Sequence, residues 1–370
     1  MKNLPLMPLM AKIRQHLADQ PDKVLSFHDY MALCLYDPED GYYMKEQVKV
    51  GKEGDFYTSA SLGEFMGEMI ARQYLRFQLE GERPLPVVEW GGGTGEMAKH
   101  FLDAVERLNP VVYQGLAYWL VEKSPYHRAM QQKTLRRHAM HTQWGGPEEG
   151  GGLPCRAFVF SNELLDAFPV HRVRMERGEW KELYVAWDSG KECLVEREGP
   201  CTPAVREYLD QEGIRLLEGQ TAEVNLQARS WVKEQASRLE EGVLLTIDYG
   251  DTAEELYSSH RMNGTLLCYR GHLAYDDPFR FPGEQDMTSH VNFTACIRAG
   301  KEGGIQQETL RTQKEFLVDN GLLELMADHS SPDPFGPEAR RNRAIRQLLL
   351  SDGMSELFKV LLQTKGLSLA

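Results

Sequence analysis

One segment constrains the fold of this chain more than any other, and it runs Val87-Val88-Glu89-Trp90-Gly91-Gly92-Gly93-Thr94-Gly95. A short apolar run ends there in a glycine cluster, and residues 96–108 then place apolar side chains at helical spacing. Glycines let the backbone turn sharply and let a ligand approach the main chain. The N–H groups at the start of the helix suit a carboxylate or a phosphate. The segment therefore predicts a strand, a ligand-binding turn and a helix.

Two nucleotide-binding patterns fit these glycines. Gly93-x-Gly95-x-x-Ala98 fits the loose dinucleotide fingerprint, which leaves an NAD(P)-dependent oxidoreductase as an alternative. Glu89-x-Gly91-x-Gly93-x-Gly95 fits the acidic motif of S-adenosylmethionine (SAM) methyltransferases, and the strand-terminal Glu89 favours it. Glu122 closes the next strand and can accept both ribose hydroxyls of either ligand, so it does not discriminate between them.

Alternating strand and helix patterns continue beyond this turn and predict a doubly wound α/β core. Strands are expected near 117–121, 157–160 and 243–247, and helices at 96–108 and 126–139. Residues 170–200 read as an antiparallel β insertion, because short strands are separated there by turn residues. We expect residues 1–84 to form a helical segment with a lid loop over 41–59, and residues 85–370 to form the core. The last 65 residues are expected to be mainly helical.

The strand predicted near 157–160 is followed by Ser161-Asn162-Glu163-Leu164-Leu165-Asp166. In an open parallel sheet the ligand crevice lies at the carboxyl ends of the strands, so Asn162 and Glu163 are expected to project into it. A polar pair there can orient a nucleophilic nitrogen beside a methyl group. Turn or helix capping is the alternative, with even odds for Asp166.

Composition excludes several classes of function. The chain has 42 Lys and Arg against 55 Asp and Glu, a net charge of −13, which disfavours a nucleic-acid partner. No stretch reaches the roughly 18 apolar residues of a membrane helix, so no membrane partner is expected. Six cysteines without CxxC spacing indicate reduced thiols, a cytoplasmic location and no metal site.

Several ordered motifs together resemble the MidA-type SAM-dependent methyltransferases, over nearly the whole chain. Gly54-Asp55-Phe56-Tyr57-Thr58-Ser59 is similar to the family's GDFxTSPE signature, although Ala60-Ser61 stand where the family has Pro-Glu. The Gly-rich turn and the segment 161–169 resemble two further motifs. The remaining matches are Ile247-Asp248-Tyr249-Gly250 and the block from Pro282 to Phe293.

The resemblance implies a Rossmann-like class I methyltransferase core, SAM as the cofactor and a protein arginine side chain as the acceptor, since the family includes a mitochondrial protein-arginine methyltransferase. It implies cofactor contacts from Thr58, Ser59, Glu89, Gly91, Gly93, Gly95, Glu122 and Asn162. Candidate catalytic residues are Glu163, Asn162, Asp55 and Asp166, with Glu163 the first choice. A small-molecule methyltransferase and a non-catalytic SAM-binding assembly factor stay as alternatives, and a homodimer is compatible with the sequence.

Overall fold

A computed structural model describes residues 8–46, 60–79, 81–146, 152–326, 336–350 and 354–369. The chain divides into two compact units. The first comprises Met1–Tyr57, Leu165–Trp231 and Gly250–Cys296, and the second comprises Thr58–Leu164, Val232–Tyr249 and Ile297–Ala370. Because both units interleave distant segments, they do not test the expected division at residue 84, which stays a prediction.

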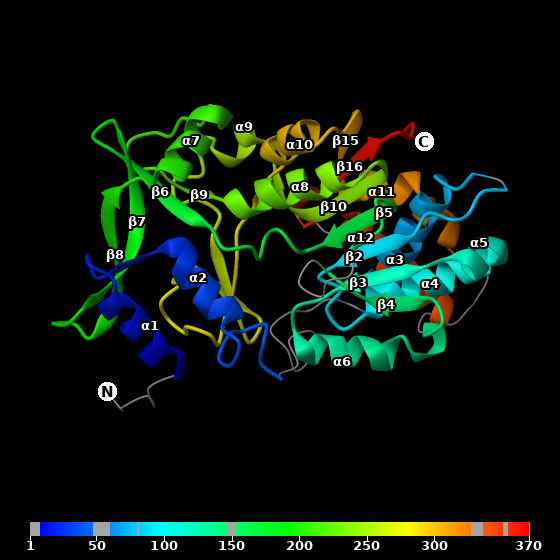
Figure 1. Ribbon diagram of the computed structural model, residues 1–370, viewed down its shortest axis with the longest axis horizontal. Helices are drawn as coiled ribbons and strands as arrows, with labels where there is room; N and C mark the ends of the chain where they lie inside the picture. The colour runs from blue at the N-terminus through cyan, green and yellow to red at the C-terminus, as the bar shows by residue number, and fades with distance from the viewer. Residues whose placement is uncertain are drawn as a thin grey trace. The chain divides into compact units, whose positions relative to one another are not determined.

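The second unit is built on a mostly parallel sheet, in which β2, β3, β4 and β5 lie side by side (Figure 1). The strand order is β15-β16-β10-β5-β2-β3-β4, and β10, β5, β2, β3 and β4 run parallel. Their bounds are β2 Val87–Trp90, β3 Tyr118–Val121, β4 Thr142–Trp144, β5 Arg156–Asn162, β10 Glu241–Asp251, β15 Gln307–Thr312 and β16 Phe358–Lys365. The chain proceeds outward from β2 to β4 and then returns to β5 on the other side of β2. The junction of β2 and β5 is thus a topological switch point, where open α/β sheets bind ligands. The predicted doubly wound core is confirmed.

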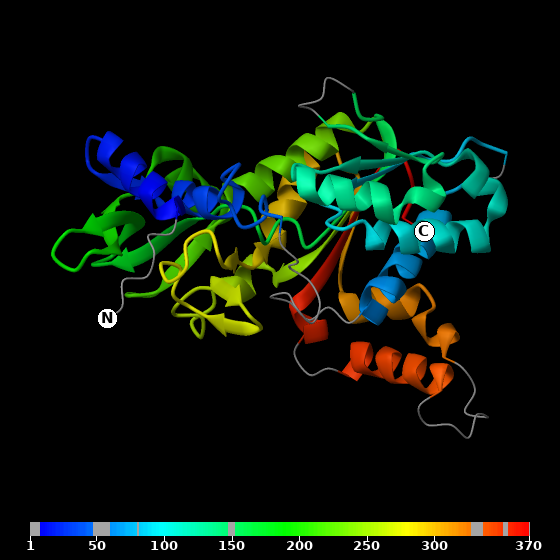
Figure 2. The ribbon, with the colours of Figure 1, turned by 90° about the horizontal axis from the view of Figure 1, so that it is seen from below.

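The helix that follows β2 buries an apolar stripe against the sheet. α4 has the bounds predicted from its helical spacing, Glu96–Leu108, and it buries Phe101, Leu102 and Val105 beside Phe158 and Phe160 of β5. Figure 2 shows α12, the orange-red helix, next to α3, whose Phe65 belongs to the same core. The other bounds are α3 Ala60–Leu75, α5 Pro110–Gly115, α6 Pro125–Thr134, α8 Leu226–Arg238, α10 Phe293–Glu302, α11 Gln313–Asp319, α12 Pro337–Leu350 and α13 Met354–Leu357.

The structure changes two expectations for this unit. The last 65 residues contain the helices α11, α12 and α13, as expected, but they also contain two strands that were not expected. β15 and β16 extend the central sheet, and β16 pairs antiparallel with β10 from Tyr249 to Gly242. The short apolar run of β16 has no helical period, and its alternate residues Phe358, Val360 and Leu362 enter the core. The helix expected over 126–139 ends at Thr134, and a 3₁₀ turn follows over Arg136–His138.

The first unit contains the antiparallel insertion that the turn residues predict. β6 His171–Glu176, β7 Glu179–Asp188 and β8 Cys193–Pro200 form a meander, which β1 Val24–Ser26 and β9 Thr221–Val224 extend. The remaining bounds are α1 Pro8–Asp19, α2 Phe27–Tyr36, α7 Pro203–Glu212, α9 Ala253–Leu256, β11 Leu267–Arg270, β12 Leu273–Tyr275, β13 Asp286–Thr288 and β14 Val291–Asn292.

A capping side chain and the cysteines of the chain can be described briefly. The Ser26 hydroxyl accepts a hydrogen bond from the Asp29 N–H at the start of α2. None of the six cysteines, all of which lie in described ranges, forms a disulfide bond. Across the described ranges, no helix combines the length and the apolar character needed to cross a membrane.

Candidate cofactor and acceptor site

The Gly-rich turn joins β2 to α4 at the switch point and has a backbone that favours glycine. Gly91, Gly93 and Gly95 have φ angles of +70°, +50° and +83°, in the left-handed region that other residues rarely adopt. Gly95 caps α4 without a side-chain hydrogen bond, so the first-turn N–H groups are not covered by a capping side chain. The sequence-based prediction of a sharp turn opening a helix is therefore confirmed.

The space around this turn fits a ligand that approaches the backbone. A Cβ atom added at Gly93 would meet no atom of the described residues within 4 Å. At Gly91 it would lie 2.8 Å from Leu164 Cδ1, and at Gly95 it would lie 3.2 Å from Gln131 Cα. The outer glycines thus pack against protein, whereas Gly93 faces open space that a SAM molecule can fill.

Glu89 lies beneath the turn. Its side chain is only 2% exposed, and its carboxylate accepts a 2.9 Å hydrogen bond from the Tyr118 hydroxyl of β3. Burial raises the pKa of Glu89 to about 7, and the nearby Glu122 adds to this rise while the Tyr118 bond opposes it. A Cβ atom at Gly92 would lie 3.1 Å from this carboxyl group, so Glu89 contacts the turn from below.

Glu122 directly follows β3 and keeps one edge accessible, with its side chain 9% exposed. Its carboxylate accepts a 2.8 Å bond from the Ser124 N–H and a 3.4 Å bond from Gln131 Nε2. Burial raises the pKa of Glu122, while the N–H groups of Ser124, Lys123 and Gly93 oppose the rise. The exposed edge of this carboxylate is where the ribose hydroxyls of SAM can reach it.

The end of β5 brings Asn162 and Glu163 beside the Gly-rich turn, because Trp90 and Ser161 are register partners in the parallel pair. Asn162 Nδ2 donates a 3.1 Å bond to Glu163 Oε1, and the Glu163 side chain is exposed. Glu163 has a φ of +51°, an uncommon conformation for a non-glycine residue. Desolvation by surrounding protein raises the pKa of its carboxyl group, and the Asn162 bond opposes the rise. The carboxyl thus has protein around it and one side open to solvent.

Asp248 of β10, which sequence reasoning noted only as part of a motif, holds this strand end. Its fully buried carboxylate accepts a 3.1 Å bond from the Leu164 N–H and a 2.9 Å bond from the Tyr249 N–H. The Glu163 N–H donates to the Ile247 carbonyl at 2.9 Å. These bonds fix the unusual backbone at Glu163 to the neighbouring strand.

The sequence predicts four further site residues. Asp55, Thr58 and Ser59 lie outside the described residues. Asp166 belongs to the first unit, where it is 4% exposed and its carbonyl accepts a 3.0 Å bond from the Ser289 N–H. The roles predicted for these four residues stay predictions.

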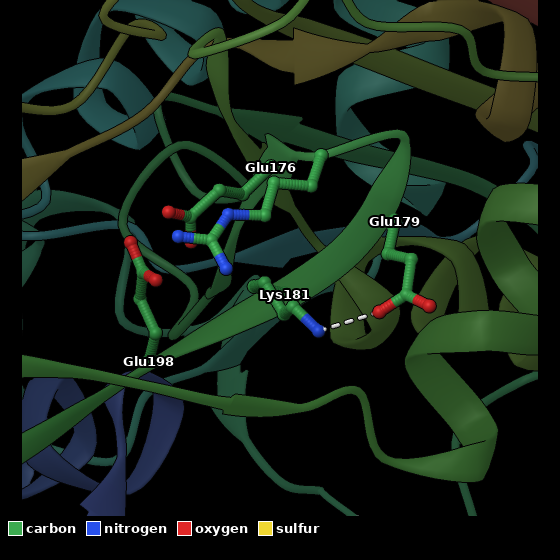
Figure 3. A pocket seen from close by; sticks show the side chains of 5 residues that line it. Glu176, Glu179, Lys181 and Glu198 are labelled. Carbon is green, nitrogen blue, oxygen red and sulfur yellow. Dashed lines mark hydrogen bonds and ion pairs between the residues drawn. The ribbon is translucent and has the colours of Figure 1, made fainter.

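Two acidic groups of the first unit have partners within the protein. The carboxylates of Asp37, Glu39 and Asp40 could hold a cation, but Lys12 Nζ lies 2.8, 2.8 and 2.9 Å from them. A depression of about 460 Å³ is lined by charged side chains of the β6–β7–β8 meander. Within it Lys181 pairs with Glu179 at 2.7 Å (Figure 3).

Comparison with known proteins identifies the family. Residues 67–310 match the model of a family described as "Putative S-adenosyl-L-methionine-dependent methyltransferase". The match covers well over half of the chain, which therefore belongs to this family. Its cofactor is SAM, and the NAD(P) alternative falls away.

Two crystal structures from Burkholderia thailandensis resemble the fold closely. One is a native structure with 31% identity and a TM-score of 0.83, and the other holds S-adenosyl-homocysteine, with 30% identity and a TM-score of 0.86. Each comparison covers 97% of this chain and 92% of the other. The Rossmann-like class I core is confirmed.

Curated relatives are more distant. The chain is 26% identical over 302 residues to the protein named protein arginine methyltransferase NDUFAF7 homolog, mitochondrial, of Drosophila melanogaster. It is 25% identical over 335 residues to protein arginine methyltransferase NDUFAF7, mitochondrial, of Xenopus tropicalis. These matches cover 72% and 83% of this chain, but only 64% of the fly protein and 75% of the frog protein.

Proposed function

We propose that this methyltransferase transfers the methyl group of SAM to an arginine side chain of a protein. The observation that carries the proposal is Glu163, an exposed carboxylate at the end of β5, beside the turn where the cofactor would bind. The names of the fly and frog relatives support the same acceptor.

Methyl transfer from SAM requires the protein mainly to position the two reactants. When bound, SAM supplies a methyl group already activated on a sulfonium, so the protein mainly positions the acceptor and excludes water. Gly93 and Glu122 would hold the cofactor through the backbone and the ribose. An arginine side chain stays charged in water, with a pKa above about 12, and it needs a carboxylate that localises its charge and frees one nitrogen.

Glu163 meets that requirement. Its carboxylate can pair with the guanidinium group while Asn162 holds one of its oxygens. The attacking nitrogen loses one proton as its bond to carbon forms, and a carboxylate with a raised pKa is suited to accept that proton. We therefore assign Glu163 both the binding of the acceptor and the uptake of its proton.

Labelling tests the proposal. The purified protein is incubated with SAM carrying a tritiated methyl group and with a cell lysate, and the labelled species are identified by mass spectrometry. We expect a labelled protein that yields methylarginine on acid hydrolysis. Label on a small molecule, or on another amino acid, would overturn the arginine assignment.

The role of Glu163 has its own test. Glu163→Gln is expected to keep SAM affinity within a few-fold and to lose most of the turnover. Glu179→Gln, at an exposed position of the β6–β7–β8 meander, is the matched control and should keep full turnover. Unchanged turnover in Glu163→Gln would remove that residue from the mechanism without affecting the acceptor assignment. The cytoplasmic location and a homodimer stay predictions.

A further inference from the structure

Gln131 of α6 connects three parts of the cofactor site. Its side chain is fully buried, and its Nε2 donates a 2.9 Å bond to the Gly93 carbonyl and a 3.4 Å bond to Glu122 Oε2. Its Oε1 accepts a 2.8 Å bond from Trp144 Nε1 on β4. One amide thus joins the Gly-rich turn, the ribose carboxylate and the outermost parallel strand.

The orientation of this amide is fixed by chemistry. An indole N–H can only donate, so the atom that faces Trp144 must be the amide oxygen. The amide NH₂ group must then face the Gly93 carbonyl and the Glu122 carboxylate, both of which are acceptors. In the reverse orientation the NH₂ group would face the Trp144 N–H, and the amide oxygen would face the Gly93 carbonyl and the Glu122 carboxylate. The Trp144 N–H therefore fixes the orientation in which the NH₂ group faces the cofactor site.

Packing adds a second constraint at the start of α4. A Cβ atom at Gly95 would lie 3.2 Å from both Cα and Cγ of Gln131, so the turn is closed against this residue. Gln131 therefore holds the left-handed backbone at Gly93 through a hydrogen bond to the Gly93 carbonyl. It holds the left-handed backbone at Gly95 by packing directly against it. Gln131 itself has no exposed surface through which a ligand could reach it.

We infer that Gln131 is a positioning residue for the cofactor, which aims the Glu122 carboxylate at the ribose and holds the Gly-rich turn open at Gly93. It acts through these two residues and touches no ligand. The inference rests on SAM as the cofactor and does not depend on the identity of the methyl acceptor. It predicts an effect on ligand binding that requires no turnover.

The experiment compares two ligands by calorimetry: S-adenosylhomocysteine and its analogue lacking the 2′ and 3′ ribose hydroxyls. Gln131→Leu is expected to weaken S-adenosylhomocysteine binding by about tenfold to a hundredfold, because the Gly93 carbonyl and the Glu122 carboxylate both lose a hydrogen-bond donor. The analogue should lose less. The preference of the wild-type protein for the ribose hydroxyls should shrink by about fivefold or more, towards the level of Glu122→Gln.

Two further variants keep the result interpretable. Trp144→Phe removes the indole N–H that orients the amide, together with part of the ring, and leaves Gln131 itself in place. It should therefore weaken S-adenosylhomocysteine binding in the same direction even where Gln131→Leu folds poorly. Gln363→Leu makes the same exchange at another fully buried glutamine of the sheet, on β16, and should leave the affinity unchanged.

Three results would overturn the inference. They are an unchanged affinity in both Gln131→Leu and Trp144→Phe, an equal loss for the two ligands that preserves their ratio, and a wild-type protein that does not distinguish the ligands. The second result would indicate a general loosening of the fold, and the third would remove the ribose role of Glu122.

Discussion

Replacing Glu89 by Gln should change how the stability of the protein depends on pH. The carboxyl of Glu89 is 2% exposed, and burial raises its pKa from the ordinary 4.5 to about 7. A group whose pKa is higher in the folded chain than in the unfolded chain binds its proton more tightly when folded. Its contribution to stability is therefore fully present below about pH 4.5 and is lost as the pH rises through about 7.

The magnitude follows from the two pKa values. One pKa unit corresponds to about 1.4 kcal/mol, so the separation between 4.5 and about 7 corresponds to about 3 kcal/mol. That is a large share of the 5–15 kcal/mol, roughly, by which domains are stable. In Glu89→Gln the side chain no longer ionises, while its amide oxygen can still accept the bond from Tyr118. The loss of about 3 kcal/mol between acid and alkaline pH should disappear.

Urea unfolding at a series of pH values between 4.5 and 8.5 measures this effect. The Gln side chain can itself change the free energy of unfolding, but by the same amount at each pH, so the change with pH isolates the ionisation of Glu89. Glu234→Gln, at an exposed position of α8, is the matched control and should follow the wild-type pH dependence. A Glu89→Gln protein that loses as much stability as the wild type over this range would refute the reasoning.

Three further predictions concern single residues of the same unit. Gly93→Val should abolish SAM binding by calorimetry, because its side chain enters the space left for the ligand, whereas Gly178→Val, with a similar positive φ and open surroundings, should retain it. Asp248→Asn should speed amide hydrogen exchange over residues 161–166, measured by mass spectrometry, since the Leu164 N–H loses a carboxylate acceptor; unchanged exchange would contradict this. Burial lowers the pKa of His138 below the ordinary 6.5, so its contribution to stability is present above that pH and lost on acidification. His138→Asn should reduce that acid-side loss in urea titrations, and a loss as steep as in the wild type would count against it.

The sequence predicts an element correctly where the pattern that indicates it lies within a few consecutive residues. The helix over 96–108 has the bounds expected from its apolar spacing, and the glycines at 91, 93 and 95 have the left-handed angles that a sharp turn requires. β16 was missed because a short apolar run near the end of the chain has no period that separates strand from helix. Its partner, β10, lies more than a hundred residues earlier, so no local pattern records the pairing.

Gln131 and Asp248 were not predicted for a related reason. Gln131 lies on a mostly polar helix, where nothing distinguishes it from its exposed neighbours, and its partners come from the turn at 93 and the strand at 144. Asp248 acts on Leu164, 84 residues away. Residues that support a site through buried hydrogen bonds are identified by the fold, whereas residues that face a ligand at a strand end are identified by position along the strand.

The two acids at the ends of β2 and β3 illustrate this distinction, although they look equivalent in the sequence. Glu89 is buried against Tyr118 and lies 3.1 Å from the position of a Cβ at Gly92, so its carboxyl supports the turn from within the protein. Glu122 keeps exposed surface and is aimed by Gln131. A direct cofactor contact is therefore better assigned to Glu122 than to Glu89. The acidic residue of the glycine motif then acts by filling the space beneath the turn, which explains why Gly92 is small even though its backbone does not require glycine.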